Sequence, residues 1–421
     1  MPDGLRSVEE HLDAILGEIE PLADFAQPLI DALDLVCTEE IVAPIRLPRF
    51  DNSAMDGYAV RAEDVATAAE ESPVKMRVVG EIGAGQGNRL SPGGARALPE
   101  GTAVKIMTGA PMPRNADCVI PYEWTDRGVD QVWIAQSAHR GQHVRYAGED
   151  VALGDLLIEP GTQLGPRQLG LLASVGRNAV RVRPRPRVLI VSTGSELRDP
   201  GAELAPDSIY DGNSYLLAAA ARRAGCVPSR AGALPDDPTS FLAGLAAKVG
   251  SADVVVTSGG ISMGDYDVVK EALGGDDEVW FGGVAMQPGK PQGFGHLRVG
   301  ADERRVPFFA LPGNPVSAYL SFEIFVRPAL RRMMGIAPES RQPITARITH
   351  DVRSPYGRRQ FLRGTLTDAG GHRSVAEVVP VGGSGSHLVG DLSASDCVIV
   401  VPEREMEIAA GSMVSVIRLD D

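Results

Sequence analysis

The feature that most constrains the fold is an alternation of apolar runs and helical segments that begins near Arg187. The runs RVLIVST, ADVVVTS and VPFFAL carry few polar residues, and helical segments such as NSYLLAAAARRAG lie between them. Strands that are buried on both faces and separated by helices are typical of parallel sheets. The sequence therefore predicts an α/β multidomain protein with a doubly wound sheet in this region.

Three polar loops follow these predicted strands and mark the expected ligand site. They are STGSEL (192–197), TSGGISMGDYD (257–267) and LPGNPVS (311–317). In open α/β sheets, ligands bind at the carboxyl ends of the strands, where the connecting loops meet. We therefore expect residues of these three loops to line one site.

The rest of the chain divides around this region. Residues 8–37 have helical spacing, residues 42–145 carry short alternating runs broken by turn residues, and residues 151–176 show a strand, a turn and a helix. From residue 336 onward, short apolar runs between glycine-rich turns predict an all-β C-terminal domain. We expect the β-rich segment to be an insertion whose flanking segments pack together.

The composition argues against some classes of protein. A net charge of −14 does not favour a general nucleic-acid binder, which needs a clustered positive surface. The four cysteines are far apart and predict reduced, buried thiols. The N-terminal segment is unlike a signal peptide and no run is apolar enough to cross a membrane, so we expect a cytoplasmic protein.

The loop GGISMG (259–264) contains G-x-S-x-G, which presents a nucleophilic serine in one class of hydrolases. There the serine directly follows its strand, whereas here three residues separate Ser262 from Ser258 and no HGGG loop precedes it. The sequence favours the alternative, a glycine nest whose backbone N–H groups bind phosphate. Asp265 and Asp267 then either cap the next helix or bind a metal or a ligand ring.

Smaller motifs add candidate residues. GKPQG (289–293) is not a P-loop because proline follows Lys290, but this lysine could neutralise a phosphate. In LPGNP, Asn314 and Pro315 suit either a helix start or a ligand contact. Glu196 follows a strand and a glycine turn, a position suited either to helix entry or to metal or ligand binding.

Together, these motifs closely resemble the MoeA/gephyrin family of molybdopterin molybdenumtransferases. The resemblance covers nearly the whole chain and rests on seven motifs in family order. They are PRFDNSAMDGYAV (48–60), VKIMTGAPMPRNADCVIP (104–121), RYAGEDV (145–151), STGSEL (192–197), SGGISMGDYD (258–267), QPGKPQGFG (287–295) and LPGNPVSA (311–318). No single motif is specific enough, whereas seven in order are hard to reach by chance.

The resemblance implies an elongated, L-shaped homodimer of four domains. It implies an N-terminal dimerisation domain from residues 1–47 and 148–182, an inserted β-rich domain at 48–147, a MogA-like molybdopterin-binding domain at 183–335 and a C-terminal β barrel at 336–421. The site would lie between the sheet domain of one subunit and the insertion of the other.

The family reaction would use adenylylated molybdopterin and molybdate as substrates. The pyrophosphate bond is hydrolysed with a divalent cation such as Mg²⁺, and AMP and molybdenum cofactor are released. The resemblance also implies a MogA-like adenylyltransferase and molybdoenzyme apoproteins as partners, and no nucleic acid.

By the same resemblance, the site residues come from three domains. The catalytic residues would be Asp56, Thr108, Asp150, Glu196, Asp267, Lys290 and Arg363, with Glu196 and Asp267 as metal ligands. The substrate-binding residues would be Ser258, Gly259, Gly260, Ser262, Asp236, Asp237, Pro312, Gly313, Asn314, Pro315 and Ser386. The sequence does not decide between Asp236 and Asp237.

Two further points shape the functional expectation. Several bacterial members carry additional lysines upstream of the PGK motif, where this chain has Gly283 and Gln287. Fewer positive charges predict weaker binding of molybdate or phosphate. Gephyrin is also a scaffold that binds a cytoplasmic loop of a membrane receptor near the C-terminal domain, so a non-enzymatic scaffold for a membrane receptor or cytoskeletal protein is a second hypothesis.

Overall fold

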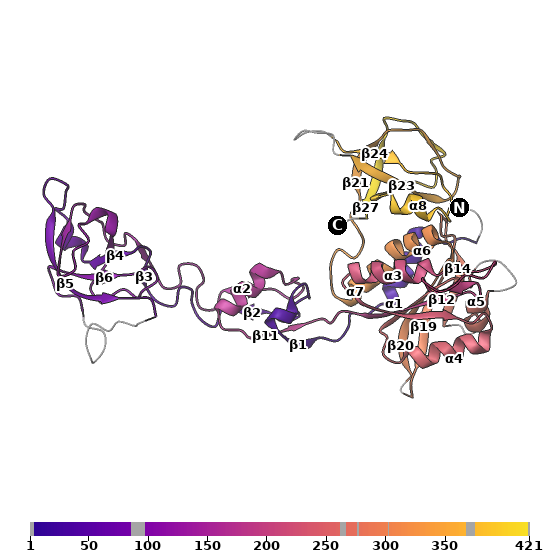
Figure 1. Ribbon diagram of the computed structural model, residues 1–421, viewed down its shortest axis with the longest axis horizontal. Coiled ribbons are helices and arrows are strands. Elements are labelled where there is room, and N and C mark those ends of the chain that lie inside the picture. The colour runs from indigo at the N-terminus through magenta and orange to yellow at the C-terminus, as the bar shows by residue number, and fades with distance from the viewer. Residues whose placement is uncertain are drawn as a thin grey trace. The chain divides into compact units, whose positions relative to one another are not determined.

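The computed structural model describes residues 4–85, 97–261, 267–275, 278–301, 303–367 and 375–419. The chain forms two compact units (Figure 1). The larger unit comprises Met1–Ala26, Asp34–Val36 and Arg181–Asp421, and the smaller unit comprises Gln27–Leu33 and Cys37–Val180. None of the helices in the described ranges is long and apolar enough to span a membrane.

A six-stranded sheet with the order β15-β12-β16-β20-β19-β17 forms the centre of the larger unit. The first four strands run parallel, as the sequence predicts, whereas β19 and β17 are antiparallel to their neighbours. The sequence did not predict this antiparallel half. The connection between Val299 and Arg304 is too short for a parallel crossover, so β19 and β20 form a hairpin. The strands span Arg187–Thr193 (β12), Val227–Leu234 (β15), Val254–Ser258 (β16), Val279–Gly283 (β17), Pro291–Val299 (β19) and Arg304–Leu311 (β20).

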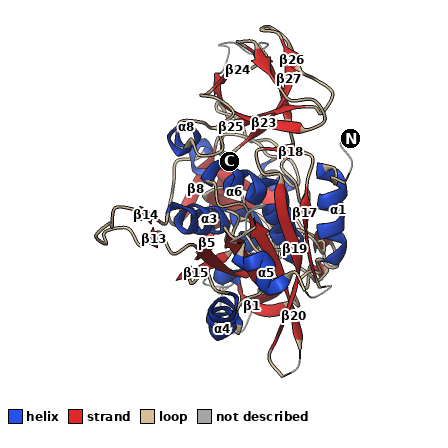
Figure 2. Ribbon diagram, turned by 90° about the vertical axis from the view of Figure 1, so that its right-hand side faces the viewer, coloured by secondary structure: helices blue, strands red, loops and turns tan. Residues whose placement is uncertain are grey.

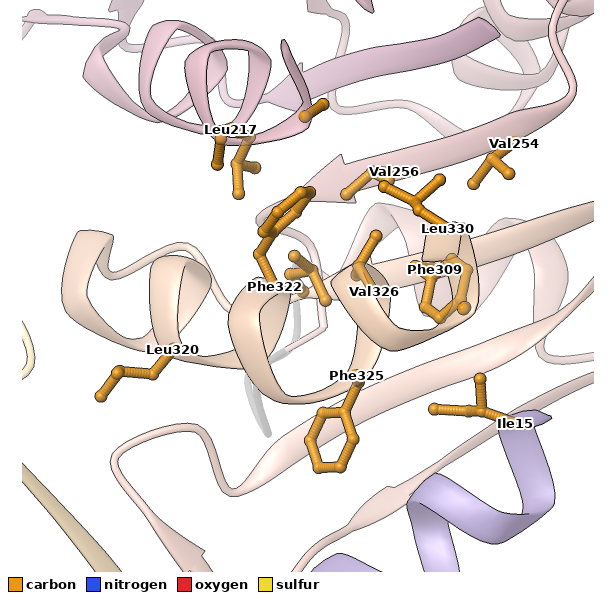
Figure 3. Packing of buried hydrophobic residues seen from close by; sticks show 14 of the residues in the cluster. Ile15, Leu217, Val254, Val256, Phe309, Leu320, Phe322, Phe325, Val326 and Leu330 are labelled. Carbon is orange, nitrogen blue, oxygen red and sulfur yellow. The ribbon is translucent and has the colours of Figure 1, made fainter. Parts of the chain in front are cut away.

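Helices cover both faces of this sheet, as β16 illustrates. Val254 and Val256 belong to a cluster that includes Leu217 and Phe322, whereas Val255 belongs to a second cluster (Figure 3 shows the first). Successive side chains of a strand point to opposite faces, so this apolar run is buried on both sides. The helices are α1 (Val8–Glu18), α3 (Gly212–Arg223), α4 (Pro238–Val249), α5 (Val268–Leu273), α6 (Pro315–Ser321) and α7 (Arg327–Met333), with a π-helical turn at Phe322–Val326.

The N-terminal helix is shorter than the sequence predicts. It ends at Glu18 instead of continuing to residue 37, and the chain then forms β1 (Phe25–Pro28) and a 3₁₀ turn (Leu29–Ala32). Pro21 and Pro28 account for the difference, because proline lacks the N–H that an α-helix needs and its ring clashes with the preceding turn.

The C-terminal part of the larger unit is a closed five-stranded barrel, at the top of Figure 2. Its strands follow the order β23-β24-β21-β27-β25, and β25 pairs back with β23. The short strand β18 also pairs with β23, so backbone hydrogen bonds join the barrel to the sheet region. The strands span Ile344–Ile348 (β21), Arg359–Thr367 (β23), Glu377–Pro380 (β24), Cys397–Val401 (β25) and Met413–Arg418 (β27), and the short elements are Leu197–Arg198 (β13), Ile209–Tyr210 (β14), Met286–Gln287 (β18), Val352–Arg353 (β22), Glu407–Ile408 (β26) and Val389–Ser393 (α8).

The smaller unit is built around a five-stranded sheet with the order β7-β4-β6-β5-β8. The segments that flank this β-rich part pair with each other through β2 and β10. The finer division into four domains stays a prediction. The elements are β2 (Ile41–Val42), β3 (Asn52–Ser53), β4 (Gly57–Val60), β5 (Val74–Ile82), β6 (Thr102–Ile106), β7 (Cys118–Pro121), β8 (Gln131–Ile134), β9 (Val144–Arg145), β10 (Leu156–Ile158), β11 (Ala179–Val182), α2 (Pro166–Ser174) and 3₁₀ turns at Ala62–Val65 and Tyr122–Trp124.

A buried histidine anchors α1 to the core of the larger unit. His11 is 1% exposed, and its ring centroid lies 4.8 Å from those of Trp280 and Phe325. Burial, with a smaller effect from the positive charge of Arg6, lowers the pKa of His11 to about 3. The imidazole is therefore neutral in the folded protein at neutral pH.

We expect this histidine to make the protein less stable in acid. Between pH 6.5 and about 3 the unfolded chain binds a proton that folded His11 does not, so the free energy of unfolding falls as the pH falls, by about 2 kcal/mol at pH 5 relative to pH 7. His11→Phe should remove this part of the pH dependence in urea titrations at the two pH values. The same change at the exposed His139 should leave it intact.

Candidate functional site

A cleft of about 1310 Å³ lies in the larger unit at the carboxyl ends of β12, β16 and β20. All three polar loops that the sequence singled out contribute to its walls, together with residues of the barrel. The candidate residues that line the cleft are Glu196, Asp236, Ser258, Gly259, Gly260, Lys290, Pro312, Gly313, Asn314, Pro315 and Ser386.

The side chain of Asn213, at the start of α3, holds two of these loops together. Its Nδ2 atom donates to the hydroxyl of Ser258 at 2.8 Å and to the carbonyl of Gly313 at 2.6 Å. One amide group therefore links the ends of β16 and β20 to the start of α3.

The loop after β16 begins with two glycines in the left-handed region. Gly259 has φ +98° and Gly260 has φ +69°. A Cβ on Gly259 would lie 2.9 Å from the Thr193 hydroxyl, and one on Gly260 would lie 2.8 Å from a methyl group of Val269. The backbone conformation and the close approach of β12 to Gly259 and of α5 to Gly260 therefore require glycine.

The glycine nest itself is only partly described. The N–H of Gly259 donates to the carbonyl of Leu311 at 3.1 Å, so this amide is occupied within the protein. Ser262 and Asp265 lie outside the described residues. The sequence favours a phosphate-binding loop over a nucleophilic Ser262, and this preference stays a prediction.

The structure separates the two neighbouring aspartates that the sequence could not. Asp236 lines the cleft, and its carboxylate accepts from the N–H of Ser195 at 2.6 Å. Asp237 caps α4 by accepting from the N–H of Ser240 at 2.9 Å, and hydrogen bonding from the side chain and the N–H of Ser240 lowers the pKa of Asp237. Asp237 is not among the residues that line the cleft.

The two predicted metal ligands differ in position. Glu196 lines the cleft, and its carboxylate folds back over Gly194. Asp267 directly precedes α5, is half-buried, and is not among the lining residues. In the described ranges no three His, Cys, Asp or Glu side chains are grouped to hold a metal ion.

Two positive side chains, Lys290 and Arg358, line the cleft. The neutral Gln287, on β18, lies in the same wall. A Cβ on Gly283 would meet a methyl group of Leu5 at 2.4 Å and the stem of Lys290 at 3.5 Å. The space beside Gly283 is thus filled by other side chains, and a lysine there would displace them.

Arg363 is placed behind the cleft. It is 2% exposed, and its guanidinium donates to the carbonyls of Gly383 and of Gly385, the latter at 3.2 Å. This loop supplies Ser384 and Ser386 to the cleft wall. Arg363 therefore positions the loop, and burial lowers the pKa of its guanidinium.

The loop held by Arg363 docks on the start of α6. The amide of Asn314 donates to the Ser386 hydroxyl at 2.9 Å, and the N–H of Val316 donates to the carbonyl of Ser386 at 3.1 Å. Asn314 and Ser386, which the sequence linked only through the family resemblance, are thus in direct contact.

The smaller unit brings two of its three predicted site residues together. Asp56 accepts from the N–H of Thr108 at 2.7 Å and from its hydroxyl at 2.8 Å. These two hydrogen bonds lower the pKa of Asp56, whose carboxylate stays ionised. Asp150 is exposed, and its N–H donates to the carbonyl of Leu47.

Several cleft residues were missed by the sequence reasoning. Ser192 and Thr193, at the end of β12, line the cleft together with Asp211 and Asn213, at the start of α3. Asp211 was detectable in principle, because an aspartate three residues before Ser214 and directly before a helical pattern is a typical N-cap. The burial of the Asp211 carboxylate could not be predicted, because a single sequence does not show which capping residues are buried.

The cysteine prediction is confirmed for the structure. Cys37, Cys118, Cys226 and Cys397 are all buried, free thiols. Burial raises the pKa of Cys226 to about 12, so its reactive thiolate is disfavoured at neutral pH.

Comparison with known proteins agrees with this architecture. Three family models match in order: the MoeA N-terminal region (domain I and II) at residues 6–176, a probable molybdopterin binding domain at 189–332 and the MoeA C-terminal region (domain IV) at 345–419. Molybdopterin molybdenumtransferase 2 of Mycobacterium tuberculosis is 43% identical over 418 residues, which cover 98% of this chain and 99% of the relative. The chain belongs to the MoeA family.

Other relatives and solved structures extend the comparison within the MoeA family. Molybdopterin molybdenumtransferase of Haemophilus influenzae is 35% identical over 390 residues, which cover 92% of each chain. The crystal structure of a molybdopterin biosynthesis moeA protein from Pyrococcus horikosii has a TM-score of 0.81 and 34% identity, and it covers 99% of this chain and 100% of that chain.

Gly259 and Gly313, two glycines of the cleft that lie next to each other, allow a matched test. Gly259→Ala should lower the free energy of unfolding by about 1–3 kcal/mol, because alanine is strained at φ +98° and crowds Thr193. Gly313→Ala should change it little, because the nearest atom, the Cα of Gly259, lies at an ordinary 3.5 Å. Equal losses for the two variants in denaturant titrations would contradict this description of the loop.

Proposed function

We propose that this protein inserts molybdate into adenylylated molybdopterin and releases AMP. The observation that carries the proposal is the cleft at the carboxyl ends of β12, β16 and β20, in the segment that matches a probable molybdopterin binding domain. Its walls combine glycine-rich loops, two cations and two exposed carboxylates. This combination suits an anionic substrate whose phosphates must be bound and cleaved.

The cations would bind the negative groups of both substrates. The side chains of Lys290 and Arg358 have no carboxylate partner within the part of the chain that the structure describes, so their charges are available to a phosphate or to molybdate. Gln287 supplies a neutral amide in place of a further lysine. We therefore still predict that this protein binds these anions more weakly than relatives that have the lysine.

The carboxylates would serve the divalent cation. Mg²⁺ is usually held by one or two carboxylates together with substrate phosphates and water. Glu196 and Asp236 fit that donor set, since both line the cleft and the N–H of Ser195 holds the carboxylate of Asp236. When bound, the metal polarises a phosphoryl oxygen of the pyrophosphate bond. Asp267, which the resemblance names as a ligand, stays a candidate.

The bond that breaks joins the two phosphates of the adenylate. Water adds to this bond, so that one phosphate leaves on AMP and the other stays on the pterin side. The positive side chains of the cleft offset the charge of both products, and the Ser384 and Ser386 loop offers hydroxyl donors to the same anions.

We also propose that the protein works as a homodimer in the cytoplasm. In the smaller unit, Val42 of β2 pairs with Leu156 of β10, and the two are 47% and 49% exposed. Ile30 and Leu153, in the same unit, are 78% and 65% exposed. A two-stranded ribbon with exposed apolar side chains is marginal in water unless another surface covers it, and a second copy would do so.

A MogA-like adenylyltransferase would supply the substrate, and molybdoenzyme apoproteins would accept the product.

The neighbouring aspartates give the sharpest test of this activity. Given adenylylated molybdopterin, Mg²⁺ and molybdate, the purified protein should release AMP, measured by chromatography. Asp236→Asn should reduce the rate at least about 100-fold, because a cleft carboxylate is lost. Asp237→Asn should leave the rate unchanged, because asparagine is an equally good helix cap. If the folded wild-type protein releases no AMP, the proposed activity is excluded.

A second candidate function is a scaffold of the gephyrin kind. The observation that favours it is an apolar cavity of about 280 Å³ between α1, the helical segment after β20 and the barrel strands. Leu12, Ile324 and Ile417 line this cavity, and the buried pair of Glu323 and Arg341, 2.8 Å apart, closes one side of it. A short apolar segment of a membrane receptor or cytoskeletal protein would fit such a cavity.

Single variants can distinguish the two functions, because different residues line the cavity and the cleft. If the scaffold exists, the tagged protein retains a membrane or cell-division protein, Ile324→Asp loses that partner, and AMP release persists. Asp236→Asn should show the reverse pattern. A partner that is retained equally by wild type and Ile324→Asp would argue against the cavity as its binding site.

A further inference from the structure

Only one of the two carboxylate oxygens of Asp211 has a hydrogen-bond partner among the described residues. Its Oδ1 atom accepts from the hydroxyl of Ser192 and from the N–H of Ser214, both at 3.0 Å. Its Oδ2 atom is buried and has no hydrogen-bond partner among the described residues. The residue is 3% exposed, and it belongs to the lining of the cleft.

Helix capping does not explain this arrangement. Asp237 caps α4 in the same way, with one carboxylate oxygen accepting from the N–H three residues later, yet Asp237 is exposed to solvent. A cap therefore accounts for Oδ1 of Asp211 but not for the burial of Oδ2. A buried acceptor without a partner is costly in a native protein, so a partner from outside the chain is expected.

The surroundings narrow the chemistry of that partner. Both hydrogen bonds that Asp211 accepts in the described chain come from uncharged groups, the Ser192 hydroxyl and the Ser214 N–H. A phosphate or molybdate oxygen would be repelled by the carboxylate. An uncharged N–H donor of a ligand fits the free acceptor.

A second unpaired group belongs to the residue that follows Ser192, the hydroxyl donor to Asp211. The hydroxyl of Thr193, at the end of β12, is buried, lacks a hydrogen-bond partner among the described residues and also belongs to the cleft lining. The strand end and the helix start thus both present polar groups without a partner in the described chain, and a few such groups orient the ligand in a typical binding pocket.

We propose that Asp211 Oδ2 accepts a hydrogen bond from an exocyclic amino group on a heterocycle of the substrate. The inference rests on the proposed function, in which the substrate carries two such rings, a pterin and an adenine. Lys290 and Arg358 then bind the anionic groups, while Asp211 selects the uncharged ring. Asp211 is in this account a specificity-determining residue of the cleft.

The direct test is Asp211→Asn. The N–H of Ser214 keeps the amide oxygen at the Oδ1 position, so the NH₂ group replaces Oδ2 and turns an acceptor into a donor. Affinity for adenylylated molybdopterin, measured by equilibrium dialysis, should fall about 10- to 100-fold. Asp237→Asn, the matched cap variant, should leave affinity unchanged.

Two simpler ligands identify the ring. If the pterin is recognised, Asp211→Asn weakens binding of molybdopterin and not of AMP; if the adenine is recognised, the pattern is reversed. Unchanged affinity for all three ligands would overturn the proposal, as would a loss of affinity that merely follows a loss of folded protein in circular dichroism.

The wild-type protein gives an independent test that needs no variant. It should prefer AMP to IMP, or a 6-substituted pterin to the matching lumazine, because the second member of each pair lacks the amino group. The absence of both preferences would overturn the proposal. If the protein releases AMP but shows neither ligand preference, only the role of Asp211 is contradicted. If the wild-type protein binds none of the ligands, both the role of Asp211 and the proposed function are contradicted.

Discussion

The structure of the larger unit depends on the burial of β12, β16 and β20 on both faces. Alternate side chains of these strands enter two separate apolar clusters, one with α1, α3 and the helices after β20, the other with α4 and α5. This packing fixes the strand ends side by side. The polar loops that follow the strands are therefore gathered at one edge of the sheet, and the amide of Asn213 links them there.

The parts of this arrangement that a local pattern encodes were predictable. Apolar runs without polar alternation located the parallel strands, and the loops after them proved to share one cleft. The antiparallel strands β17 and β19 were missed, although the short connection between β19 and β20 is a local hairpin signal. The N-terminal helix was predicted too long, because helical spacing was given more weight than Pro21 and Pro28.

Site residues show the same limit at finer scale. Asp236 and Asp237 are adjacent and chemically identical, and only the position of the α4 start shows which one caps the helix and which one lines the cleft. The resemblance named Arg363 as a catalytic residue, and the structure shows it buried and holding a loop of the cleft wall. The unpaired oxygen of Asp211 depends on burial and on two hydrogen bonds to the other oxygen, which no spacing in the sequence reports.

We propose one chemistry for the cleft, in which cations would bind the anionic groups of the substrates and carboxylates would serve the metal and the ring. Its central claim is most directly tested in cells, by expressing the protein in a bacterial strain that lacks its own molybdopterin molybdenumtransferase. The account predicts that molybdoenzyme activity returns with the wild-type protein. Folded protein at normal abundance that restores no molybdoenzyme activity would contradict it.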